Sequence, residues 1–126
     1  MINIENFLKN LLEQISLNGN NDQFTITLPF KLFNDEQSSF SIILNKHIDG
    51  YYLVNDHGYT LKYLKNLDVN LSSYEEQIEI ICSLYSIKIE DGLVKGIVGY
   101  GTNQLYIQLF NYLQAISHLS TLKFLY

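Results

Sequence analysis

The chain has 126 residues, of which 47% are hydrophobic and 17% are charged, and its formal net charge is −5 at pH 7. This length predicts a single domain over residues 1–126 with one core, and the composition excludes a mainly disordered chain. The acidic charge repels phosphates, so neither nucleic acid nor an anionic membrane is expected as a partner.

A single cysteine, Cys82, excludes an intrachain disulfide and a zinc site built on several thiolates. It lies on the apolar stripe of a predicted helix, which favours inert packing over nucleophilic chemistry. Residues 1–14 show an amphipathic pattern instead of a basic leader followed by an apolar run, and no stretch of roughly eighteen apolar residues occurs. We therefore expect a cytoplasmic protein without a membrane span.

Residue usage is strongly biased. Every basic residue is lysine, arginine and tryptophan are absent, and asparagine, isoleucine, leucine and tyrosine are abundant. AT-rich codons favour this usage, which indicates a low-GC bacterium, its phage or a mobile element. Without arginine, the chain also lacks the bidentate fork that recognises phosphate or guanine edges.

The first predicted element is an amphipathic helix over residues 3–17. Its apolar residues recur at spacings of three and four, which places them on one stripe: Ile4, Phe7, Leu8, Leu11, Leu12 and Ile15. Asn3 can cap the start of this helix. Residues 18–21, Asn-Gly-Asn-Asn, favour the left-handed backbone that ends a helix.

Three strands are predicted next. Residues 24–28 alternate apolar and polar side chains, and Pro29 marks the end or edge of that strand because proline lacks a backbone N–H. Residues 40–44 and 51–54 form the second and third strands. Asp49-Gly50 between them favours a tight turn, so we expect these two strands to pair antiparallel.

A further turn over residues 55–58 leads into two helices. Thr60 is in position to cap a short helix whose apolar residues are Leu61, Tyr63, Leu64 and Leu67. A longer helix starts near Ser72 or Ser73, where Ser73 and Glu76 match the capping-box pattern. Residues 87–90 and 93–98 then form two strands joined by an Asp-Gly hairpin turn at residues 91–92.

The last predicted helix, over residues 102–124, is the most apolar. Its remaining positions form one narrow strip: Gln104, Gln108, Asn111, Ala115 and His118. A helix apolar over so wide an arc either lies in the core under a sheet or contacts another subunit, and both alternatives stay open. The apolar residues at 122–126 add an expectation of a homodimer formed through this C-terminal helix.

The order of these elements contains no regular alternation of strand and helix, so it predicts the α+β class instead of a doubly wound sheet. We expect an antiparallel sheet of about four to five strands, packed against the N-terminal helix and the long apolar C-terminal helix.

Two segments carry a recognisable pattern. Residues 26–30 read Ile-Thr-Leu-Pro-Phe, and residues 52–61 read Tyr-Leu-Val-Asn-Asp-His-Gly-Tyr-Thr-Leu. They resemble a family of uncharacterised bacterial and prophage domains, domain of unknown function 1828, whose members show a Thr-Pro-Phe segment, a strand and a Leu-Thr-Asp-Asp-Gly turn before a short helix. Asn-Asp-His-Gly at residues 55–58 departs from the paired aspartates. The resemblance implies the family's fold and a prophage or mobile-element setting, and it supplies no activity.

Acidic and imidazole side chains near the turns are candidate metal ligands, because carboxylate and imidazole suit a divalent cation. Asp49 and Asp56, however, lie at opposite ends of a strand, about 23 Å apart at roughly 3.3 Å per residue, which is too far for one site. Aspartate and glycine are also the residues that tight turns need. The enzymatic alternative is a metal-dependent hydrolase or nuclease that uses Asp35, Glu36, Asp56 and His57.

Ten tyrosines provide the other candidate site, because tyrosine is enriched at protein interfaces. Neighbouring strand residues point to opposite faces, so either Tyr51 or Tyr52 lies on the outer face of the sheet. With Tyr59 and Tyr63, which are one helical turn apart, that tyrosine would form an aromatic patch. We expect Asp56, Lys62 and Lys65 at its rim, and ordinary core packing is the alternative.

These observations favour a non-catalytic protein-protein interaction module of phage or mobile-element origin. Its partner-binding residues would be Tyr51, Tyr52, Tyr59, Tyr63 and Asp56, with no catalytic residue, cofactor or metal. The expected partner is a host protein, and one specific version of the hypothesis is an inhibitor of a host defence or regulatory protein.

Overall fold

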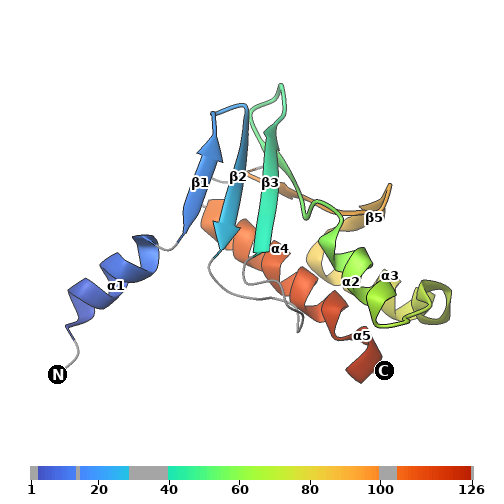
Figure 1. Ribbon diagram of the computed structural model, residues 1–126. Helices are drawn as coiled ribbons and strands as arrows, with labels where there is room; N and C mark the ends of the chain where they lie inside the picture. Colours follow the sequence, from blue (N-terminus) through green and yellow to red (C-terminus); the bar gives the residue numbers. More distant parts are fainter. Residues whose placement is uncertain (1–2, 14, 29–39, 100–104, 126) are drawn as a thin grey trace.

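The computed structural model describes residues 3–13, 15–28, 40–99 and 105–125 (Figure 1). The strands are β1 (Ser16–Gly19), β2 (Gln23–Leu28), β3 (Phe40–Lys46), β4 (Tyr52–Asn55), β5 (Lys88–Glu90) and β6 (Leu93–Val98). The helices are α1 (Ile4–Glu13), α2 (Tyr59–Asn66), α3 (Glu75–Tyr85), α4 (Leu105–Ser120) and α5 (Leu122–Leu125), with a 3-10 turn, η1 (Leu71–Tyr74), before α3. The predicted α+β class is confirmed.

The strands form one sheet in the order β1-β2-β3-β4-β6-β5, and all neighbours are antiparallel. The β3–β4 and β5–β6 hairpins are confirmed at their predicted Asp-Gly turns. In the second turn, Asp91 and Gly92 have φ values of 57° and 76°, and two successive left-handed residues are what a two-residue hairpin of type I′ requires. The expected strand 24–28, which ends before Pro29, is present as β2, whereas Pro29 itself lies outside the described residues.

The predicted helix over residues 3–17 is shorter than expected. Asn3 does cap its start, since Asn3 Oδ1 accepts the backbone N–H of Asn6 at 3.2 Å. The helix nevertheless ends at Glu13, and Ser16–Gly19 form strand β1 of the sheet.

Strand β1 is the reason that the sheet has more strands than predicted. Leu17 lies opposite Ile26 of β2 in an antiparallel ladder. Asn20 Oδ1 accepts the backbone N–H groups of Asp22 and Gln23 at 2.9 and 3.1 Å, and these bonds close the β1–β2 turn. Asparagine and glycine suit hairpin turns as well as helix ends, and here strand pairing decides between the two.

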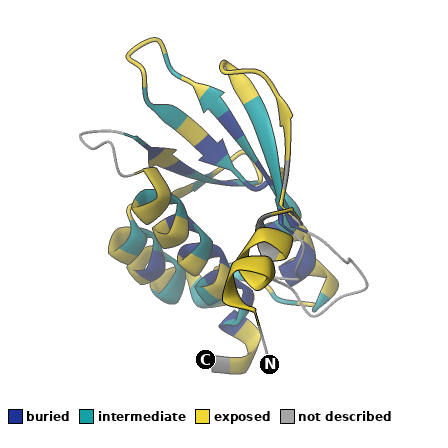
Figure 2. Ribbon diagram, turned by 90° about the vertical axis from the view of Figure 1, so that its left-hand side faces the viewer, coloured by how far each residue is buried: buried dark blue, intermediate teal, exposed yellow. Residues whose placement is uncertain are grey.

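Helices α2, α3 and α4 lie on one face of the sheet, called the inner face below (Figure 1). Strand residues alternate between the two faces: Phe40, Ile42 and Leu44 of β3 are buried, whereas Ser41 and Ile43 are only half-buried. Figure 2 shows the same alternation of burial along the strands. The core therefore lies between the inner face and these three helices.

Helix α4 is the main core helix. This agrees with the first of the two predicted alternatives, a core helix under the sheet or a contact with another subunit. Its fully buried residues lie in the C-terminal half: Tyr112, Ala115, Ile116 and Leu119. Ala115 is therefore not part of a polar strip. The start of the C-terminal tail packs on this core, because Leu122 of α5 is fully buried and Lys123 Nζ donates to the Leu67 carbonyl at 2.9 Å.

The polar residues of α4 are used inside the domain. Asn111 Nδ2 donates to the Tyr85 carbonyl at 3.1 Å, and His118 Nδ1 lies 3.4 Å from the Tyr85 hydroxyl, so both contact the end of α3. Gln108 Oε1 accepts the Gly99 N–H at the end of β6. These contacts fix the orientation of α4 against α3 and β6.

Two predicted helix caps are wrong. Thr60 does not cap α2, because that helix already begins at Tyr59 and the Thr60 side chain is buried. The Ser73 capping box is not formed either. Instead, Asn70 Oδ1 accepts the N–H of Ser72 at 3.2 Å and starts the 3-10 turn before α3. Asn70 bonds the N–H two residues ahead of it, as asparagine commonly does in turns, whereas the capping box would have to join Ser73 and Glu76, which are three residues apart.

Candidate binding surface

Asp56 is fully buried at the end of β4. Its Oδ1 accepts the N–H groups of Gly58 at 3.0 Å and of Val94 at 3.1 Å, and its Oδ2 accepts the N–H of Thr60 at 2.9 Å. The carboxylate therefore ties together the end of β4, the first turn of α2 and the start of β6. Its negative charge also lies at the N-terminus of α2, where the helix dipole stabilises it.

Tyr112 of α4 completes this buried connection. Its hydroxyl donates to the Val94 carbonyl at 2.6 Å, so both backbone groups of Val94 are bonded by side chains. Burial raises the pKa of Tyr112, and the nearby charge of Asp56 raises it further. The hydroxyl consequently stays protonated and remains a donor.

The residues expected for a hydrolase do not converge. Asp56 is fully buried and accepts three backbone N–H groups, whereas His57 is exposed in the turn, with its own N–H bonded to Asn55 Oδ1 at 2.8 Å. Asp35 and Glu36 lie outside the described residues. Among the residues that the structure describes, no group of three or more histidine, cysteine, aspartate or glutamate side chains could hold a metal ion.

Cys82 on α3 is half-buried. Burial raises the pKa of its thiol, and the charge of Glu79 adds to this effect. The thiol is thus mainly protonated at neutral pH, which fits the predicted packing role.

The tyrosines do not form the single patch that the sequence suggests. Tyr51 and Tyr52 lie where β4 begins, whereas Tyr59 and Tyr63 lie in the helix that follows its other end. Tyr63 belongs to the core, and Asp56, which is expected at the rim of the patch, is fully buried. Tyr51 and Tyr52 thus lie at one end of strand β4, and Tyr59 and Tyr63 lie beyond its other end. The short spacing of these residues in the sequence does not reveal this separation in space.

Of these four tyrosines, the three outside the core are half-buried against neighbouring rings. Tyr51 stacks on His47 with a centroid separation of 4.3 Å. Tyr52 packs edge-on against Phe24 at 5.4 Å, and its hydroxyl donates to the Asn21 carbonyl. The ring of Tyr59 lies 6.4 Å from that of Phe40. Each ring therefore has a local packing role.

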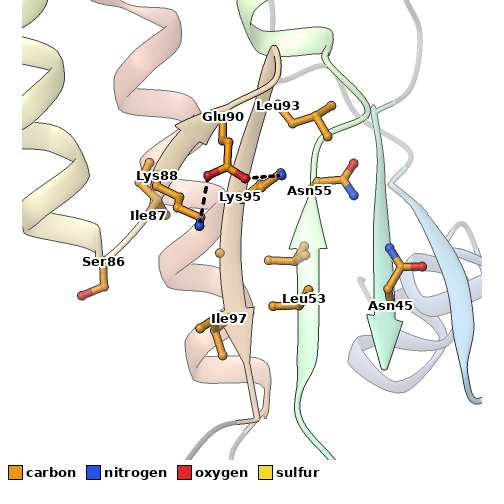
Figure 3. Close-up of a pocket in the computed structure, with 12 residues that line it drawn as sticks. Asn45, Leu53, Asn55, Ser86, Ile87, Lys88, Glu90, Leu93, Lys95 and Ile97 are labelled. Carbon is orange, nitrogen blue, oxygen red and sulfur yellow. Dashed lines mark hydrogen bonds and ion pairs between the residues drawn. The ribbon is translucent and has the colours of Figure 1, made fainter. Parts of the chain in front are cut away.

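A groove of about 640 Å³ lies on the outer face of the sheet, across β4, β6 and β5 (Figure 3). Leu53 and Ile97 are paired across β4 and β6, and their side chains are 42% and 49% exposed. Asn45 of β3 continues the same row, opposite Leu53. Side chains in one row across a sheet are direct neighbours, so this row is an apolar pair flanked by an amide.

Charged groups border the other end of the groove. Glu90 lies between two lysines, 3.0 Å from Lys95 Nζ and 3.3 Å from Lys88 Nζ. The hydrogen bond from Lys95, followed by that from Lys88, lowers the pKa of the Glu90 carboxyl. Asn55 lies beside Lys95 in the same row of the sheet. The groove thus combines an apolar part with amides and an ion-paired rim.

The sequence alone does not predict the groove, because Tyr51 to Val54 form a continuous apolar run. Such a run does not show which residues face the core. The available signal was Ile97: it lies between Gly96 and Val98, both of which alternate to the inner face with Val94. In the sequence, the charged Lys95 favours the outer face, and Ile97, two residues further along the strand, shares that face.

The family model described as "Domain of unknown function DUF1828" matches residues 28–119. The chain belongs to this family. The DUF1828 match runs from the end of β2 into α4, and so includes Asp56 and the whole groove, whereas α1 and β1 precede it. No curated protein and no solved structure matches the chain.

In the described part of this DUF1828 chain, no helix has both the length and the apolar character needed to cross a membrane.

Proposed function

We propose that this protein is a non-catalytic protein-protein interaction module that binds a partner protein in the groove on the outer face of its sheet. The observation that carries the proposal is the uncovered pair Leu53 and Ile97, paired across β4 and β6 within a groove bordered by amides and ion pairs. Interfaces combine an apolar centre with a polar, hydrated rim in this way.

The chemistry of the groove suits recognition of a protein segment. Leu53 and Ile97 can bury an apolar side chain of the partner, and the amides of Asn45 and Asn55 can donate to and accept from its backbone. Amide groups would thereby set the orientation of the segment while the apolar contact supplies affinity.

The biological setting belongs to the same proposal. The residue usage fits a low-GC bacterium, its phage or a mobile element as the source, and a host protein as the partner is part of the proposal. In the specific version, this partner is a host defence or regulatory protein that is inhibited when its surface is occupied. The single cysteine fits action in the reducing cytoplasm.

The test is capture of the partner from a host lysate with matched variants. Leu53→Thr/Ile97→Thr removes apolar surface while keeping residues that suit a strand. Losing about 1 kcal/mol at each position gives roughly 2 kcal/mol, or a roughly 30-fold weaker complex. Ile48→Thr is the control, because Ile48 is 95% exposed in the β3–β4 turn and does not line the groove.

We expect the wild type and the Ile48→Thr control to retain the same protein, and the groove variant to lose it. Retention by a folded groove variant would refute the groove as the binding site. For the inhibitor version, the captured protein should lose activity on addition of the wild type and keep it on addition of the groove variant.

A further inference from the structure

Helix α1 presents three apolar side chains to solvent. Ile4, Phe7 and Leu8 lie on one side of the helix and are 64%, 57% and 50% exposed. Figure 1 shows α1 leading away from the sheet, and Figure 2 shows its described residues as exposed. Among the described elements, α1 has no substantial packing contact with any other helix or strand.

A helix of this kind needs a partner surface. Isolated helices shorter than about 12–15 residues are marginal in water, and most helices in proteins are stabilised by packing of their apolar face. The ten residues of α1 are below that limit. Its sequence therefore predicts that its exposed stripe is covered in the functional state.

The first two turns of α4 carry a second uncovered apolar surface. Its side chains are Leu105, Tyr106, Ile107 and Phe110, which are 44%, 60%, 50% and 62% exposed. In contrast, the C-terminal half of the same helix is in the core. The segment 105–112 contains no charged residue, so nothing on it repels the charged groups on the polar side of α1.

We infer that these two surfaces cover each other in a symmetric dimer, in which α1 of each copy packs on the first two turns of α4 of a second copy. The chain carries both halves of the contact, as an isologous interface requires. Only two residues connect α1 to β1, and the helix leads away from its own domain (Figure 1), which favours exchange between copies over folding back.

The exposed area is sufficient for a stable dimer. Seven side chains that are about half exposed contribute roughly 100 Å² each, hence on the order of 700 Å² per copy, close to the ~800 Å² per partner of a standard interface. This surface does not include Leu53 or Ile97, so the inference is independent of the proposed groove function.

The first test is the mass of the full chain by light scattering over a concentration series. We expect a dimer for the wild type, and for Phe7→Ser and Phe110→Ser at least a tenfold weaker association each. Ile48→Ser, which changes an exposed residue outside both surfaces, should leave the mass unchanged. A wild type that is monomeric at every concentration, or a dimer insensitive to both variants, overturns the inference.

Disulfide trapping in a Cys82→Ser background then identifies the contact. Mixing chains carrying Leu8→Cys with chains carrying Ile107→Cys should give a bridged heterodimer under mild oxidation. A chain carrying both substitutions distinguishes the alternative: a bridge within a monomer at high dilution would mean that α1 covers its own α4, and would refute exchange. Absence of any bridge in the mixture would refute the pairing of these surfaces.

Discussion

Replacing Asp56 is the sharpest test of the role that the fold gives to this residue. In Asp56→Ala, three buried or half-buried backbone N–H groups, those of Gly58, Thr60 and Val94, lose their acceptor. Each unsatisfied group costs about 1–3 kcal/mol, and release of a buried charge offsets part of this, so we expect a loss of about 3–5 kcal/mol. Domains of this kind have unfolding free energies of about 5–15 kcal/mol.

The assay is urea unfolding followed by circular dichroism. Asp56→Asn keeps one acceptor oxygen but turns an NH₂ group toward a donor, so its loss should be smaller, about 1–3 kcal/mol, and measurable even if the alanine variant fails to fold. Asp49→Ala is the matched control, because this turn aspartate is 72% exposed and its contact with His47 is at the surface. We expect less than about 1 kcal/mol there. A loss below about 1 kcal/mol in Asp56→Ala would refute the reasoning.

Three further predictions concern the core. Gly96→Ala places a methyl group 2.9 Å from the Tyr112 ring, so unfolding should become about 1–3 kcal/mol easier in the same urea assay; an unchanged midpoint would contradict this packing. Thr60→Val should be neutral or stabilise the fold by up to about 1 kcal/mol, because the buried Thr60 hydroxyl has no hydrogen-bond partner among the described residues. If Thr60 were a helix cap, the same substitution would instead destabilise the fold by a similar amount. Alkylation of Cys82 by iodoacetamide should rise with pH along a curve shifted to higher pH than in urea-unfolded protein, since burial and Glu79 raise the thiol pKa; coincident curves would contradict it.

Local signals in the sequence predicted most elements of the fold. The Asp-Gly pairs at residues 49–50 and 91–92 identify the β3–β4 and β5–β6 hairpins, because each of these turns is decided by its own residues. Strand β1 was not predicted, since Asn-Gly chemistry serves helix ends and turns alike, and pairing of Leu17 with Ile26 selects the turn. Such pairing depends on contact between two segments, so the periodicity within one segment does not predict it.

The candidate sites were harder to predict for the same reason. The turn role of Asp56 follows from its neighbours, but its bond to Val94 joins residues 38 positions apart. The two tyrosine pairs are close in the chain and separated in space by β4. The groove depends on Leu53 and Ile97 becoming neighbours through the β4–β6 pairing. In the sequence, β4 precedes α2 and α3 and β6 follows them, so this pairing is not a local signal.

The position of α4 in the chain has a consequence for synthesis on the ribosome. The six strands of the described residues precede it, and its buried Tyr112 lies against Gly96 on the inner face. During translation the sheet, α2 and α3 therefore emerge before the helix that completes the cover of the inner face, and nascent chains with exposed apolar strands are prone to aggregate and to recruit chaperones. Synthesis of α4 is then the step that converts an aggregation-prone nascent chain into a domain with a buried core.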